Sequence, residues 1–100
     1  MPYGLSAEIK TKPGKREEVV SLLLRDVEGL VAHGCRAYIV SRSEDDADVV
    51  HVMEVWESKT AHDASLLLPE TRAAIAEAMP LMTGEFSGLQ LDVAGGIGLT

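Results

Sequence analysis

The sequence predicts an α+β domain in which a four-stranded antiparallel sheet carries helices on one face. Three observations support this fold class. Residues 3–11 alternate between apolar and polar side chains, which is typical of a half-buried strand. Residues 20–31 place apolar side chains at steps of three and four, which predicts a long amphipathic helix. Two further β-rich segments, 35–42 and 49–56, are separated by a short polar connector that fits a hairpin.

Turn and capping residues set the expected bounds of the helices. The turn KPGK at 12–15 precedes the first helix, and Gly34 is expected to end it. Ser58 is expected to cap a second helix, because a hydroxyl oxygen can accept from a free N–H of the first turn. Pro69 is expected to restart this helix and Pro80 to end it.

A last strand is expected over residues 86–93, which again alternate. It completes the order β-α-β-β-α-β, the ferredoxin-like split βαβ arrangement. A chain of 100 residues has room for one core, so we expect a single domain over residues 1–94. The glycine-rich segment 95–100 is expected to be a flexible tail unless something holds it.

Composition and charge exclude several classes of partner. The net charge is −7, from 16 acidic and 9 basic residues, and no run of Lys and Arg offers a phosphate-binding face. We therefore expect no nucleic-acid partner. Cys35 is the single cysteine, which suits a reducing compartment. No signal-peptide pattern and no apolar stretch of membrane-spanning length occurs, so we expect a cytoplasmic protein without a membrane partner.

The predicted strand 49–56 is apolar on both faces. One face carries Val50, Val52, Glu54 and Trp56, and the other carries Val49, His51, Met53 and Val55. Helices cover only one face of such a sheet, so the second face needs another cover, and the chain has no spare element to supply it. We therefore expect a homodimer in which two sheets pack face to face about a two-fold axis.

Three segments of the chain resemble the antibiotic biosynthesis monooxygenase superfamily. They are KPGKREE, HGCRAYIVSRSEDD and VHVMEVWESKTAHDASL, in this order and spacing. Members of that superfamily are small dimeric α/β-barrel proteins whose chemistry varies far more than their fold. They include oxygenases that oxidise quinols or polyketide-derived phenols without metal or flavin, haem-degrading enzymes and isomerases. The resemblance implies a dimeric α/β barrel for this chain.

The resemblance also implies an activity, that of a cofactor-independent monooxygenase acting on a small aromatic substrate of quinol or polyketide type. No cofactor and no metal are expected, since the His and Cys residues show no ligand spacing and no nucleotide-binding glycine motif occurs. Haem degradation is disfavoured, because Ala7 stands where haem-degrading members carry Asn and the segment PETRAAIAEAM contains no His. The alternative is a non-catalytic or isomerase-like domain that binds a small molecule in the same pocket.

Trp56 and His62 are the candidate catalytic residues. By resemblance, Trp56 lines the pocket, where its ring could stack on an aromatic substrate and its N–H could steady an oxyanion. The alternative is a core residue that closes the sheet edge. His62 could act as a base, because imidazoles titrate near neutral pH. The alternative is an exposed helix residue, and so early a helix position is expected to contribute little to the core.

Substrate-binding roles are expected for Trp56, Tyr38, Val52 and Glu54. Tyr38 could donate a hydrogen bond to a substrate oxygen, or be a strand aromatic at the sheet surface. Val52 and Glu54 share a strand face with Trp56. Val52 stands where polyketide oxygenases carry a polar Asn, which favours the non-oxygenase alternative, whereas Trp56 with a nearby histidine favours the oxygenase. His51 has the opposite parity and is expected at the dimer interface.

Overall fold

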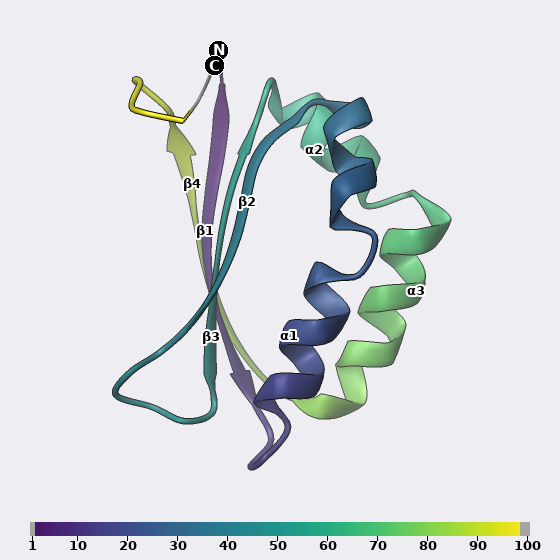
Figure 1. Ribbon diagram of the computed structural model, residues 1–100, viewed down its shortest axis with the longest axis vertical. Coiled ribbons are helices and arrows are strands. Elements are labelled where there is room, and N and C mark those ends of the chain that lie inside the picture. The colour runs from purple at the N-terminus through teal and green to yellow at the C-terminus, as the bar shows by residue number, and fades with distance from the viewer. Residues whose placement is uncertain (1, 99–100) are drawn as a thin grey trace.

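The computed structural model describes residues 2–98, and it shows one twisted sheet with all of the helices packed on one side (Figure 1). The elements follow the predicted order of strands and helices. Their bounds are β1 (Tyr3–Thr11), α1 (Arg16–Leu24), the 3₁₀ helix η1 (Val27–His33), β2 (Cys35–Arg42), β3 (Val49–Trp56), α2 (Lys59–Ser65), α3 (Pro69–Ala78), the 3₁₀ turn η2 (Met79–Leu81) and β4 (Met82–Asp92).

The four strands form an antiparallel sheet in the order β2-β3-β1-β4. The first and third strands therefore lie at its centre, as a split βαβ unit requires. In the register of the central pair, Tyr3 is opposite Trp56 and Ile9 is opposite Val50. On the other side of β3, Tyr38 of β2 is opposite Glu54. The prediction of a ferredoxin-like α+β fold with a four-stranded antiparallel sheet is confirmed.

The prediction of one long helix after β1 is wrong. Helix α1 ends at Leu24, Asp26 adopts a left-handed conformation (φ 60°), and η1 follows in a new direction. Asp is among the few residues that tolerate this conformation. The break turns the second half of the apolar pattern away from the axis of α1, so that Leu30 packs near β2 and the end of β3. Gly34 ends η1 as predicted, with φ 95°.

Strand β4 begins at Met82, four residues earlier than expected. The strand starts directly after η2, because Met82 already pairs with Thr11 across an irregularity in the β1–β4 ladder. Alternation alone cannot predict such a start, since the register shift interrupts the pattern. Beyond β4, the Val93 N–H donates to the Pro2 carbonyl (3.3 Å). The predicted flexibility of segment 95–100 stays a prediction, and its last two residues lie outside the described range.

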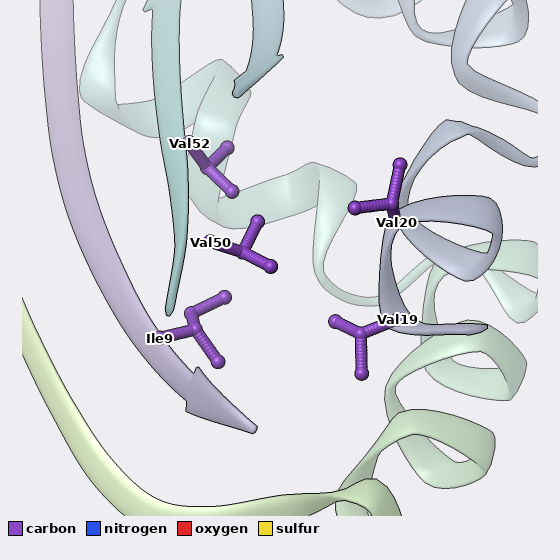
Figure 2. Close-up of a cluster of buried hydrophobic side chains, with 5 residues drawn as sticks. All are labelled: Ile9, Val19, Val20, Val50 and Val52. Atoms are coloured by element: carbon purple, nitrogen blue, oxygen red, sulfur yellow. The ribbon is translucent and has the colours of Figure 1, made fainter. Parts of the chain in front are cut away.

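The apolar core lies between the centre of the sheet and α1 (Figure 2). Its members come from β1, β3 and α1 and point toward one another in the figure: Ile9, Val19, Val20, Val50 and Val52. Val19 and Val50 are 0% exposed. β-Branched residues suit the pleated strands, and each fully buried valine contributes about 1.5–3 kcal/mol relative to exposure. This cluster fixes the position of α1 on the sheet.

The face of the sheet away from the helices carries exposed apolar side chains. Ile39 of β2 is 54% exposed, Met53 of β3 50% and Leu89 of β4 66%. Ile39 and Met53 are directly paired across the β2–β3 ladder, so they form neighbours on this face. The prediction that strand 49–56 is apolar on both faces is thus reflected in the structure. Among residues 2–98, no helix has the length and apolar character needed to cross a bilayer.

Candidate functional site

The predicted site residues lie where β3 ends and α2 begins. Side chains alternate along a strand, so Glu54 and Trp56 share the face of the sheet that the helices cover. Ser58 then starts α2, and its hydroxyl oxygen accepts a hydrogen bond from the Ala61 N–H (3.1 Å), as predicted for a cap. The cap sets the direction of the helix, so that His62, one turn later, lies against Trp56.

His62 lies between two aromatic rings. Its ring centroid is 5.2 Å from that of Tyr3 and 5.7 Å from that of Trp56, which it meets edge-on at 79°. Trp56 is 1% exposed and His62 8%. Trp56 and His62 therefore lie side by side in the interior, and the alternative of an exposed His62 is wrong. The expectation that His62 contributes little to the core is wrong, because α2 turns this residue toward the sheet.

A carboxylate joins the indole and the imidazole. Trp56 Nε1 donates a hydrogen bond to Glu54 Oε1 (3.0 Å), and His62 Nε2 lies 4.0 Å from the same oxygen. On its other side, His62 Nδ1 lies 3.0 Å from Asp63 Oδ1, and Lys59 Nζ lies 2.9 Å from Asp63 Oδ2. The exposed fraction of the side chain is 13% for Glu54 and 51% for Asp63. The polar groups therefore extend from the buried Glu54, through His62, to Asp63 at the surface.

The burial of Glu54 dominates the electrostatics of the site. Burial raises the pKa of the Glu54 carboxyl above its ordinary value of 4.5, and the hydrogen bond from Trp56 and the nearby His62 only partly oppose this shift. Burial, and then the negative charge of Glu54, also raise the pKa of the Tyr38 hydroxyl and of the Cys35 thiol. Glu54 therefore binds its proton more tightly than an exposed glutamate does. Its neighbours Tyr38 and Cys35 stay protonated.

The structure places Tyr38 beside this cluster and Val52 outside it. Tyr38 is half-buried, is opposite Glu54 in the β2–β3 ladder, and packs against both the Val50–Val52 core and the Trp56 cluster. Its reading as a sheet-surface aromatic is therefore disfavoured by its packing. Val52 is 4% exposed and belongs to the core beneath α1. Its substrate-binding role, like the roles of the other residues, stays a prediction.

Two neighbours of Trp56 were not anticipated as site residues. Tyr3 and Cys35 both lie opposite Trp56, one from β1 and one from β2, and all three are buried together. The alternation of residues 3–11 already placed Tyr3 on the inward face, so its proximity could have been inferred from pairing β1 with β3. For Cys35 the sequence holds no comparable signal, because an irregularity of register follows it. His51 is exposed on the opposite face of the sheet, as its parity predicts.

An open surface hollow of about 370 Å³ lies apart from the predicted site residues. Its lining comes from β1, β4 and the β2–β3 connection: Glu8, Lys10, Asp46, Val49, Glu85, Phe86 and Ser87. Two of these lining residues, Lys10 and Asp46, form an ion pair (2.7 Å). In the part of the chain that the structure describes, no three His, Cys, Asp or Glu side chains are grouped to hold a metal ion.

The arrangement at Glu54 can remove and return a proton. A carboxyl with a raised pKa is a stronger base when ionised than an exposed one, and it lies beside an imidazole that a second carboxylate orients. Tyr38 adds a hydroxyl donor on the same face of the sheet, and the indole N–H of Trp56 holds Glu54 Oε1. Such a pairing of a buried acid, a histidine and aromatic rings suits an uncharged substrate with an acidic O–H or C–H bond.

Similarity to known proteins identifies the family and the fold of the chain. A family model described as antibiotic biosynthesis monooxygenase matches residues 2–77. A Chloroflexus aurantiacus J-10-fl structure named as a candidate antibiotic biosynthesis monooxygenase is 32% identical, with a TM-score of 0.82, over 98% of this chain and 100% of that one. A similarly named Caulobacter crescentus CB15 structure is 27% identical, with a TM-score of 0.84, over 94% and 91% of the two chains.

A third structure shows that the fold extends to distant sequences. The Nitrosomonas europaea protein, also named as a candidate antibiotic biosynthesis monooxygenase, has a TM-score of 0.86 at 14% identity, over 93% of this chain and 90% of that one. No curated protein matches the chain. The family match covers more than half of the chain, and the resemblance carried by its three segments is confirmed. The chain belongs to the antibiotic biosynthesis monooxygenase family.

Proposed function

We propose that this protein is a cofactor-independent monooxygenase that acts on a small aromatic substrate of quinol, anthrone or related polyketide type. The observation that carries the proposal is the buried carboxylate–imidazole pair of Glu54 and His62 beside Trp56. Family membership supports the reaction class, and the aromatic side chains around Glu54 support an aromatic substrate. Tyr38, Val52, Glu54 and Trp56 are the proposed substrate-binding residues, and His62 and Trp56 are the proposed catalytic residues.

In the proposed reaction the substrate itself activates O₂. Removal of an acidic proton leaves an electron-rich anion, which transfers an electron to O₂ and then forms a C–O bond with the reduced oxygen. For an anthrone, loss of water from the hydroperoxide converts CH₂ and O₂ into C=O and H₂O, which balances without a further reductant. The protein contributes proton transfer and orientation, each of which supplies a share of the rate enhancement.

A substrate ring can stack on Trp56 only if a neighbouring side chain moves. The indole is 1% exposed, and its N–H already bonds to Glu54. A substrate ring that stacks on it must therefore displace a neighbouring side chain. Tyr3 is opposite Trp56 and is buried with it, so it is the side chain we expect to move.

Oxygen uptake tests the proposed activity. Purified protein is incubated in air with a panel of hydroquinones and anthrones, and uptake is followed with an oxygen electrode. We expect uptake with at least one member of the panel, above the uncatalysed rate, and unchanged by a metal chelator. Uptake that never exceeds the rate without protein would contradict the proposal.

A small-molecule-binding or isomerase-like protein is the second candidate function. The side chain of Val52 favours this second function, because it lies in the apolar core and not among the polar groups of the site. The protein has one Trp, so its fluorescence reports a single place. Quenching of Trp56 by a phenolic ligand without oxygen uptake would support binding alone. Quenching together with uptake supports the oxygenase.

We also propose that the protein forms a homodimer through the face of the sheet opposite the helices. The exposed Ile39, Met53 and Leu89 lie on this face, and apolar side chains of this kind are stabilised when a second sheet covers them. Light scattering should give about twice the chain mass of 10.7 kDa. Met53→Lys should dissociate the dimer, since the charge would be buried without a partner. A wild-type protein that stays monomeric and folded at micromolar concentration would overturn the proposal.

A further inference from the structure

The polar groups of the site differ in what already surrounds them. The His62 ring is packed between Tyr3 and Trp56, and its Nδ1 lies 3.0 Å from the Asp63 carboxylate. The only nitrogen of His62 left for another partner is Nε2, which faces Glu54 Oε1 at 4.0 Å. A substrate could reach Nε2 only by entering the gap between His62 and Glu54.

The Glu54 carboxylate has more acceptor capacity left. Within residues 2–98, its one hydrogen-bond donor is Trp56 Nε1, which binds Oε1. An ionised carboxylate offers about four lone-pair sites, so Oε2 and part of Oε1 remain for a substrate. The exposed fraction of the side chain is 13% for Glu54 and 10% for His62, so the two groups differ in their free acceptor capacity and not in their exposure. Of the two candidate proton acceptors, Glu54 is therefore the one with an oxygen atom, Oε2, for which no hydrogen-bond partner lies within residues 2–98.

We propose that Glu54 accepts the proton of the substrate in place of His62, and that His62, held by Asp63, is a positioning residue that keeps Glu54 ionised and oriented. This assignment rests on the proposed oxygenase function. The bond between the acidic hydrogen and the substrate breaks, its electron pair stays on the substrate, and the proton forms the O–H bond of the Glu54 carboxylic acid. Glu54 later returns this proton to the oxygen anion that forms when O₂ adds to the substrate.

The groups that face Glu54 predict how the site responds to pH. Cys35 and Tyr38 approach from β2, His62 approaches from α2, and Trp56 donates from β3. Burial raises the pKa of Glu54, and His62 opposes the shift. The base must be ionised to act, so kcat/KM should rise with pH through a midpoint above the ordinary value of 4.5. Loss of His62 should move that midpoint further up.

The kinetic test uses oxygen uptake with an anthrone as the probe and three variants. Glu54→Gln keeps the size of the side chain and an acceptor for the Trp56 N–H, and it should lower kcat by roughly 10²–10⁴-fold, the usual effect of losing a general base. Glu28→Gln makes the same charge change at an exposed position of η1 and should leave kcat unchanged. His62→Gln should move the pH midpoint of kcat/KM upward, which a purely structural role would not do. Melting curves verify that each variant is folded.

A fluorescence titration gives a readout that does not need turnover. The emission of Trp56 should change with the ionisation of Glu54, because its N–H bonds to that carboxylate. The inflection above pH 4.5 should disappear in Glu54→Gln and move upward in His62→Gln. An inflection that persists unchanged in Glu54→Gln would overturn the assignment.

The outcomes separate this assignment from the proposed function. Uptake by the wild type that survives Glu54→Gln overturns the role of Glu54 and leaves the oxygenase in place. Absence of uptake by the wild type with every probe overturns the oxygenase function and the assignment with it. Loss of uptake in Glu54→Gln, with the pH midpoint raised in His62→Gln, supports both.

Discussion

The helix-covered face of β3 is apolar at its first end and polar at its second end. On the helix-covered side of β3, Val50 and Val52 are buried in an apolar core, whereas Glu54 and Trp56, further along the same face, are buried with polar groups. Their spacing along the strand is identical, and all lie under helices. Burial alone therefore does not decide whether a position serves stability or chemistry. What differs is the element that covers each end.

Helix α1 covers the first end, and α2 with η1 covers the second. Helix α1 presents Val19 and Val20, whose aliphatic side chains point toward Val50 (Figure 2). Helix α2 presents His62, while Leu30 of η1 packs at the rim. A buried carboxylate is tolerated where hydrogen-bond donors and an imidazole surround it, and it is costly where they do not. This comparison can be tested by placing a charge at the apolar end of the strand and by removing the charge from the polar end.

The largest effect is expected from Val50→Asp. This position is 0% exposed, and the other buried members of its cluster have aliphatic side chains. An unpaired buried carboxylate should cost several kcal/mol, comparable with the ~5–15 kcal/mol that stabilise a typical domain. We expect loss of the cooperative unfolding transition in circular dichroism at neutral pH. Glu54→Gln, at the polar end, serves as the control and should keep that transition.

A smaller but clear effect is expected from His62→Ala. The side chain packs against Tyr3 and Trp56 and is 8% exposed as a residue, so its removal leaves a gap beside two rings. We expect a loss of about 1–3 kcal/mol in the free energy of unfolding, measured by urea denaturation. His33→Ala, at an exposed position, should change it by less than about 0.5 kcal/mol. Equal stability of His62→Ala and wild type would show that the ring is not part of the core.

A pH-dependent effect is expected from Glu54→Gln. Because the pKa of Glu54 is raised in the folded state, the folded chain binds this proton more tightly than the unfolded chain. Its contribution to stability is fully present below pH 4.5 and is lost as pH rises through the folded pKa. The difference in melting temperature, variant minus wild type, should therefore increase from pH 4 to pH 8. A difference that stays constant with pH would mean that the carboxyl is not perturbed.

The smallest effect is expected from Arg42→Gln, because the Arg42 side chain lies at the surface. Arg42 pairs with Glu17 in two hydrogen bonds of 2.7 Å, yet the side chains are 54% and 65% exposed. The pair lowers the pKa of Glu17 mainly through the hydrogen bond, but water screens most of its effect on stability. We expect no change in the unfolding free energy beyond experimental error. A measurable loss that vanishes at high salt would show that α1 is tied to β2 by this ion pair.

The elements that the sequence predicts well are those in which neighbouring residues decide the conformation. Alternation over residues 3–11, the cap at Ser58 and the stop at Gly34 all depend on contacts within a few positions, and the structure confirms them. The single long helix failed at Asp26, because the apolar period of residues 20–31 is the same whether the backbone continues or turns. Packing against β2 and β3 decided between the two.

The sequence by itself determined the fold class and the face of β3 to which Glu54 and Trp56 point, because strand parity fixes side-chain directions locally. Only the tertiary structure decided that Glu54 is the group between the indole and the imidazole, and that His62 is buried rather than exposed. These properties depend on distances between β1, β2, β3 and α2. Burial raises the pKa of Glu54, and burial depends on how these separate elements pack together. No local pattern in the chain predicts it.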